Sequence, residues 1–96
     1  MTHLTTVLDD LKRRFAARAG SDLTRLRSLQ DDPERQEDLR LIVHRLAGSA
    51  GFFGYGAIGD LANEVDAQLA DNVPTKTLPA LLQALEELVL AAQSAS

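Results

Sequence analysis

The sequence predicts an all-α fold, an antiparallel up-down four-helix bundle. Leu and Ala dominate the apolar residues and aromatic residues make up only 4% of the chain, which suits close helix packing better than a sheet. Apolar residues recur at helical spacing along almost the whole chain, without strand-like alternation. Short connections between the helical segments favour antiparallel neighbours within one bundle.

The first helical segment is expected to begin with Thr5 or Thr6 as its cap. Gly20 can stop or kink this helix, and Ser21 or Asp22 can then cap a second piece. The segment is therefore one long helix kinked near Gly20 or two shorter helices. Its apolar stripe before Gly20 consists of Val7, Leu8, Leu11, Phe15 and Ala19.

A clear start signal opens the second segment, because Asp32 offers a capping side chain directly before Pro33 in the first turn. The helix is expected to loosen across Gly51, Gly54 and Gly56, since glycine is poor in a helix interior and good at its end. This segment carries His44, one of the two histidines of the chain.

The third helix is predicted from about Tyr55 or Ala57 to Ala70, followed by a turn over residues 71–74. Thr77 can cap the last helix, which is rich in Leu. Together these segments form a single domain over residues 1–96, with a core of about residues 5–92. A monomer is expected, because the apolar stripes can be satisfied within one bundle.

Composition excludes several classes of function. The chain has no cysteine, so disulfides and cysteine metal sites are ruled out, and its histidine spacing indicates no metal site. A net charge of −4 with interspersed charges argues against a nucleic-acid binder. The sequence has no secretion signal and no run of about 18 apolar residues, so no membrane association and a cytoplasmic location are expected.

A helical projection places His44 on the solvent side of its segment. At about 100° per residue, the apolar residues fall between about 160° and 260° from the histidine. They are Leu39, Ile42, Val43, Leu46, Ala50 and Phe53. Within about 40° of it lie Glu37, Arg40, Gly48 and Gly51. An exposed imidazole beside a bare glycine, nucleophilic at neutral pH, is what a phosphate-accepting histidine requires.

The segment 44–54, which reads HRLAGSAGFFG, resembles the signature of histidine-containing phosphotransfer (HPt) domains. That family shows His, any residue, an aliphatic residue, usually Lys, Gly, two small residues and, after a variable stretch, another Gly. The resemblance covers nearly the whole chain, since the family is a four-helix bundle of about this length. It implies that His44 accepts a phosphoryl group from an aspartyl phosphate on a receiver domain and passes it to another receiver aspartate.

The resemblance also assigns the surroundings of the ring. Gly48 gives room for the phosphorylated ring and the approaching receiver. Asp66, or alternatively Asn63, hydrogen-bonds the second ring nitrogen and fixes its tautomer. No cofactor is expected in this chain, and Mg²⁺ belongs to the acidic pocket of the partner receiver, which comes from a response regulator or a hybrid histidine kinase.

One position departs from the family pattern, because Ala47 stands where the family usually has Lys. A cation there would hold the phosphoryl group and offset its charge. Arg40, at about −40° from His44, can reach back from one turn earlier. Arg45, at about 100°, can contribute from the flank.

A docking surface for the receiver is expected around the histidine. Leu41 and Phe52 are apolar residues at about 60° and 80° from it, close to the exposed face. An apolar residue beside an acceptor histidine is a candidate partner contact. The full set of candidate contacts is Glu37, Leu41, Gly48, Gly51 and Phe52.

Two other functions compete with the phosphorelay carrier. A purely structural helical adaptor would leave His44 incidental. The dimerisation and phosphoacceptor region of a sensor kinase normally has an acidic residue after the histidine and a proline soon after it, whereas Arg45 follows here and the next proline is Pro74. No P-loop, Ser/His/Asp set or metal pair supports independent kinase or phosphatase activity.

Overall fold

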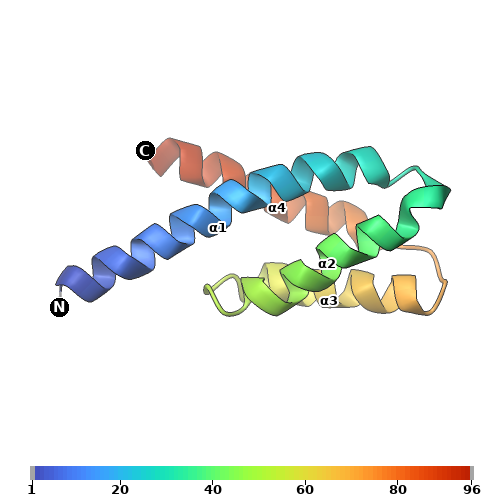
Figure 1. The fold of residues 1–96 in the computed structure, drawn as a ribbon, viewed down its shortest axis with the longest axis horizontal. Helices are drawn as coiled ribbons and strands as arrows, with labels where there is room; N and C mark the ends of the chain where they lie inside the picture. The colour runs from blue at the N-terminus through green and yellow to red at the C-terminus, as the bar shows by residue number, and fades with distance from the viewer. Residues whose placement is uncertain (1, 96) are drawn as a thin grey trace.

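The computed structural model describes residues 2–95, with side chains described for residues 6–94. Over this range the chain is helical, without strands, and its helices pack antiparallel in a bundle (Figure 1). The predicted fold class is confirmed. In chain order the elements are α1 (Thr2–Leu29), the 3₁₀ turn η1 (Pro33–Arg35), α2 (Gln36–Ala50), α3 (Gly56–Ala70) and α4 (Leu78–Ala95).

Helix α1 is continuous, so neither a break at Gly20 nor a new cap at Asp22 is present. The predicted caps at Thr5 and Thr6 are also wrong, because the helix already begins at Thr2. Gly20 lies against α4, where an added Cβ would come 3.7 Å from a methyl group of Val89. Packing along α4 therefore keeps α1 helical through a residue of low helix propensity.

The start of the second segment follows its local sequence. Asp32 accepts a hydrogen bond from the backbone N–H of Glu34 at 3.0 Å, which confirms it as a cap. The first turn, from Pro33, is a 3₁₀ turn rather than α-helix. Gln36 Nε2 adds a 3.2 Å bond to the carbonyl of Asp32, which ties η1 to the beginning of α2.

Gly54 terminates the histidine-bearing segment. Its φ of +88° lies in the left-handed region that favours glycine. The backbone N–H of Tyr55 bonds to the carbonyl of Ala50 at 2.8 Å, and that of Gly54 to the carbonyl of Gly51 at 3.1 Å. This pair of bonds is a Schellman motif, which satisfies the last carbonyls of the segment and turns the chain into α3.

Helices α2 and α3 approach each other closely at Gly59. An added Cβ there would lie 3.4 Å from the backbone nitrogen of Gly51 and 3.8 Å from the carbonyl oxygen of Ala47. The absence of a side chain at Gly59 allows this close approach. The largest fully buried side chains of the core are Leu26, Leu39, Leu46, Leu81, Leu85, Val43 and Val65.

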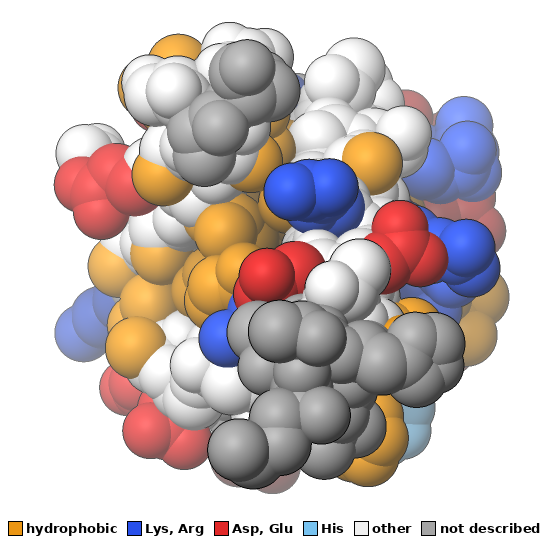
Figure 2. All heavy atoms as spheres, turned by 90° about the vertical axis from the view of Figure 1, so that its left-hand side faces the viewer, with side chains coloured by type: hydrophobic (Ala, Val, Ile, Leu, Met, Phe, Trp, Pro, Cys, Tyr) orange, Lys and Arg blue, Asp and Glu red, His pale blue; other side chains and the backbone are white. Residues whose placement is uncertain are grey.

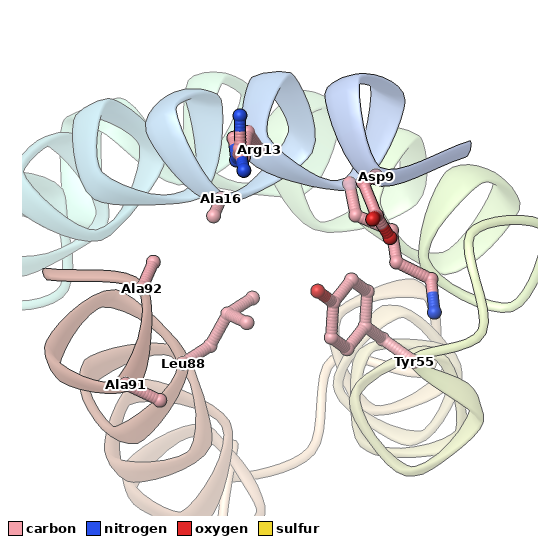
Figure 3. Close-up of a pocket in the computed structure, with 8 residues that line it drawn as sticks. Asp9, Arg13, Ala16, Tyr55, Leu88, Ala91 and Ala92 are labelled. Atoms are coloured by element: carbon pink, nitrogen blue, oxygen red, sulfur yellow. The ribbon is translucent and has the colours of Figure 1, made fainter. Parts of the chain in front are cut away.

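At one end of the molecule α1 and α4 project beyond the α2–α3 pair (Figure 1). Figure 2 views this end and shows hydrophobic side chains gathered between the helices. An open hollow of about 750 Å³ lies there, with the side chains of Tyr55 and Leu88 pointing into it (Figure 3). None of the described helices is long and apolar enough to cross a membrane.

Candidate functional site

His44 stands on the solvent side of α2, and 76% of its side chain is exposed. The apolar residues on the opposite face of the helix fill the core, as the helical projection predicts. They are Leu39, Ile42, Val43, Leu46 and Ala50, while Phe53 is partly buried. The burial of this stripe therefore determines which way the imidazole faces.

A single carboxylate on α3 holds two side chains of α2. Asp66 Oδ2 lies 3.2 Å from His44 Nδ1, and Asp66 Oδ1 accepts a 3.3 Å bond from Arg40 Nε. An ionised carboxylate can only accept hydrogen bonds, so Nδ1 carries the proton in this contact. The neutral ring then has its lone pair on Nε2, which has no hydrogen-bond partner within the described part of the chain.

These contacts also set the ionisation of Asp66. The hydrogen bond from His44 lowers the pKa of the Asp66 carboxyl, and the bond and charge of Arg40 add to the effect, while partial burial opposes it. The side chain is only 20% exposed, so both neighbours act through a partly desolvated contact. Asp66 is therefore anionic at neutral pH and ready to accept from both partners.

The surface around the ring is open and partly apolar. Leu41 is 69% exposed and Phe52 is 82% exposed. A Cβ added at Gly48 or Gly51 would meet nothing within 4 Å beyond its own helix. A shallow hollow of about 260 Å³ beside the ring is lined by Glu37, Arg40, Leu41 and His44. The predicted docking residues Glu37, Leu41 and Gly48 on α2, and Gly51 and Phe52 in the turn after it, are all exposed.

Comparison with known families decides the assignment, because the sequence profile described as "Hpt domain" matches residues 10–95. The chain belongs to the Hpt domain family. Members of this family carry out histidine phosphotransfer in phosphorelays and interact with receiver domains. No curated protein and no solved structure matches the chain.

In this Hpt domain the structure decides between Asp66 and Asn63 as the partner of the His44 ring. Asp66 contacts His44, whereas Asn63 is exposed and makes no hydrogen bond to the ring within the described residues. The two residues are three positions apart, nearly one helical turn, so sequence spacing alone left them as alternatives.

In this Hpt domain the side chain of Arg45 reaches toward α1 and makes no bond to the imidazole of His44. Its Nη2 donates a 2.6 Å bond to Oδ1 of Asp22 on α1, whose side chain is only 8% exposed. Sequence reasoning treated Asp22 as a helix cap and missed this pair. A usable signal was present, because Asp22 occupies an inward position of the apolar stripe of α1, between Ala19 and Leu26.

The lowered pKa of Asp66 predicts how stability depends on pH. Because the folded pKa is below the unfolded value of about 4, ionised Asp66 stabilises the fold above that pH, and the contribution is lost as pH falls through the folded pKa. The gap in unfolding free energy between the wild type and Asp66→Asn should therefore be larger at about pH 7 than at about pH 3. Denaturant unfolding at both pH values measures it.

A matched control is Asp60→Asn, which changes an exposed carboxylate of α3 that makes no ion pair among the described residues. The difference in unfolding free energy between Asp60→Asn and the wild type should be small at both pH values. A gap for Asp66→Asn that stays constant with pH would contradict the coupling between this carboxylate and its two partners.

Proposed function

We propose that His44 is the phosphoryl acceptor of a relay carrier, which takes the group from an aspartyl phosphate on one receiver domain and passes it to an aspartate on another. The observation that carries this proposal is the pairing of His44 Nδ1 with Asp66 on a ring that is otherwise exposed. A phosphoacceptor needs one nitrogen fixed and the other free to attack.

The chemical step follows from this arrangement. The Nε2 lone pair attacks the phosphorus of the aspartyl phosphate, an N–P bond forms, and the P–O bond to the receiver carboxylate breaks with its electron pair leaving on the carboxylate. The proton on Nδ1 stays in its hydrogen bond to Asp66, which stabilises the positive charge that develops on the ring. Transfer to the second receiver reverses these bonds.

Arg40 supplies the cation that this site needs. A phosphoryl group carries close to two negative charges, and Ala47 is a small, partly buried residue where the family usually has Lys. Arg40 is 46% exposed and already lies beside the ring through its bond to Asp66. Its guanidinium has further donors that can contact a phosphoryl group on Nε2.

The metal requirement falls on the partner. Within the described residues, no group of three or more His, Cys, Asp or Glu side chains could hold a metal ion. We place Mg²⁺ in the acidic pocket of the receiver, where it neutralises the transferring group. The carrier itself contributes the nucleophile, the fixed tautomer and one guanidinium.

The direct test mixes the purified chain with a receiver domain carrying a radiolabelled aspartyl phosphate and Mg²⁺. The expected product is a labelled chain whose phosphate is labile in acid and stable in base, as for phosphohistidine. A second, unlabelled receiver should then remove the label. A chain that stays unlabelled across all receivers of its source organism would instead support the helical adaptor.

Substitutions of Arg40 and Arg45 are expected to affect different properties, the transfer rate for Arg40 and the stability of the fold for Arg45. Arg40→Ala should slow transfer several-fold, because a charge-assisted contact at a partly exposed site contributes about 1 kcal/mol. Arg45→Ala should affect transfer less but lower the unfolding free energy by about 1–3 kcal/mol, because Asp22 is left buried without its partner. Transfer rates and thermal unfolding of both variants separate the two roles.

Two further variants sharpen this comparison. Adding Ala47→Lys to Arg40→Ala should restore part of the transfer rate, and adding Asp22→Ala to Arg45→Ala should recover part of the lost stability. If Arg45→Ala slows transfer more than Arg40→Ala, the phosphoryl charge is not met by Arg40.

A further inference from the structure

A row of arginines runs along the side of α1 that faces α2. Arg14 and Arg18 line a small hollow of about 160 Å³ between the two helices, together with Arg45 and Ser49 of α2. Arg25 follows Arg18 by seven residues, which returns it to nearly the same face of the helix. We call Arg14, Arg18 and Arg25 the arginine strip.

Two of the three arginines of the strip carry charge that no ion pair neutralises within residues 6–94. Arg14 pairs only with Asp10 on its own helix, and both side chains are more than half exposed. Arg18 and Arg25 make no ion pair within residues 6–94. Asp22, the acid that lies between them in sequence, is already bonded to Arg45. The strip therefore presents cations to solvent in a chain whose net charge is −4.

The other flank of α2 has the opposite character. Helix α3 contains no Lys or Arg, and its charged residues are Asp60, Glu64 and Asp66. On that side Arg40 lies beside the ring, where Asp66 holds it. A protein that docks on His44 consequently meets a basic flank along α1 and a neutral to acidic flank along α3.

The strip lies within reach of such a partner. The Asp22–Arg45 bond places Asp22 level with the residue after His44. Arg18 and Arg25 are four residues before and three residues after Asp22, so they lie within about 6 Å of that level along the axis. Packed helices are separated by about 8–10 Å. An interface of about 800 Å² per partner corresponds to a disc of about 16 Å radius, which covers both positions when centred on His44.

The arrangement also has the form of a docking surface. Leu41 and Phe52 are exposed, and in the helical projection both fall between His44 and Arg45, whose side chain reaches α1. Interfaces commonly combine an apolar centre with a polar rim, and arginine is enriched in them. Charges at such a rim act mainly on the association rate and on the choice of partner.

From this placement we propose that the arginine strip binds an acidic surface next to the phosphorylated aspartate of the receiver and selects receivers by charge. The inference rests on the proposed phosphotransfer function and adds the chemistry of the partner surface to it. Receivers with an acidic rim exchange phosphate rapidly with this chain, and receivers with a basic rim are repelled by Arg18 and Arg25.

The test compares Arg18→Glu with Arg13→Glu, which makes the same charge change on the same helix but on a face outside the strip. The probe is the receiver domain to which the phosphorylated wild type transfers fastest. In low salt, Arg18→Glu should reduce kcat/KM for transfer about fivefold and Arg18→Glu/Arg25→Glu by about tenfold or more, with Arg13→Glu close to the wild type. In about 0.5 M NaCl the differences should largely disappear, because screening shortens the range of the charges.

Labelling of His44 by phosphoramidate, a small donor that needs no protein partner, reports the acceptor chemistry separately. Equal losses in Arg18→Glu and Arg13→Glu, or a loss that persists in high salt or with phosphoramidate, would overturn the proposal. So would a strip-dependent affinity for a short DNA duplex without any change in transfer. A wild-type chain that exchanges phosphate with no receiver would refute the phosphotransfer function itself, which is a distinct outcome.

Discussion

Replacement of His44 by Gln is expected to abolish phosphoryl uptake while the bundle stays folded. The ring is 76% exposed and its described contact is the bond to Asp66, so the fold loses about one hydrogen bond, or about 0.5–1.5 kcal/mol. Glutamine keeps a polar side chain but has no ring nitrogen that can form an N–P bond. Incubation with a phosphorylated receiver, followed by gel autoradiography, measures the loss.

Two controls make this result specific. Circular dichroism and thermal unfolding should show a helical content close to that of the wild type. His3→Gln changes the other histidine of the sequence, whose side chain lies outside the described residues, and it should label normally. Normal labelling of a folded His44→Gln protein would remove the basis of the proposed function.

The second large effect is expected at Gly48, one turn after His44. A Cβ at this position would meet nothing within 4 Å beyond its own helix, so a side chain costs no packing there. Gly48→Gln should therefore keep or raise the unfolding free energy, by up to about 1 kcal/mol, because glycine is a poor helix former. Transfer should slow by about tenfold or more, since the new side chain occupies the space that the ring and receiver share.

Ala80→Gln is the matched control, because it introduces the same side chain at an exposed position of α4. It should leave transfer unchanged. Phosphoramidate labelling then separates the two possible causes, since a small donor is slowed only where the ring itself is obstructed. An unchanged transfer rate in Gly48→Gln would show that the glycine has no part in docking.

Local physics allowed much of this protein to be predicted from its sequence. Helical periodicity identified the buried stripe of α2 and so the exposed side of His44, because a helix repeats its facing residues within one or two turns. The cap at Asp32 and the helix-ending glycine at Gly54 depend on backbone groups only a few residues away. The succession of helical segments and the ends of α3 were predicted correctly, whereas the start of α1 and the possible break at Gly20 were not.

Other features were decided only when distant segments packed together. In the sequence Gly20 suggests a break in the first helix, but contact with α4 keeps α1 continuous. Arg45 follows His44 in sequence, yet it bonds to Asp22 on α1. Arg40 and His44 both bond to the carboxylate of Asp66 on α3. Helical spacing gives the direction of a side chain but not the helix it meets, and that depends on close approaches such as the one at Gly59. The exposed position of His44 could therefore be predicted from the sequence, whereas the packing of α3 against α2 decided its bond to Asp66 and the packing of α1 against α2 decided the bond between Arg45 and Asp22.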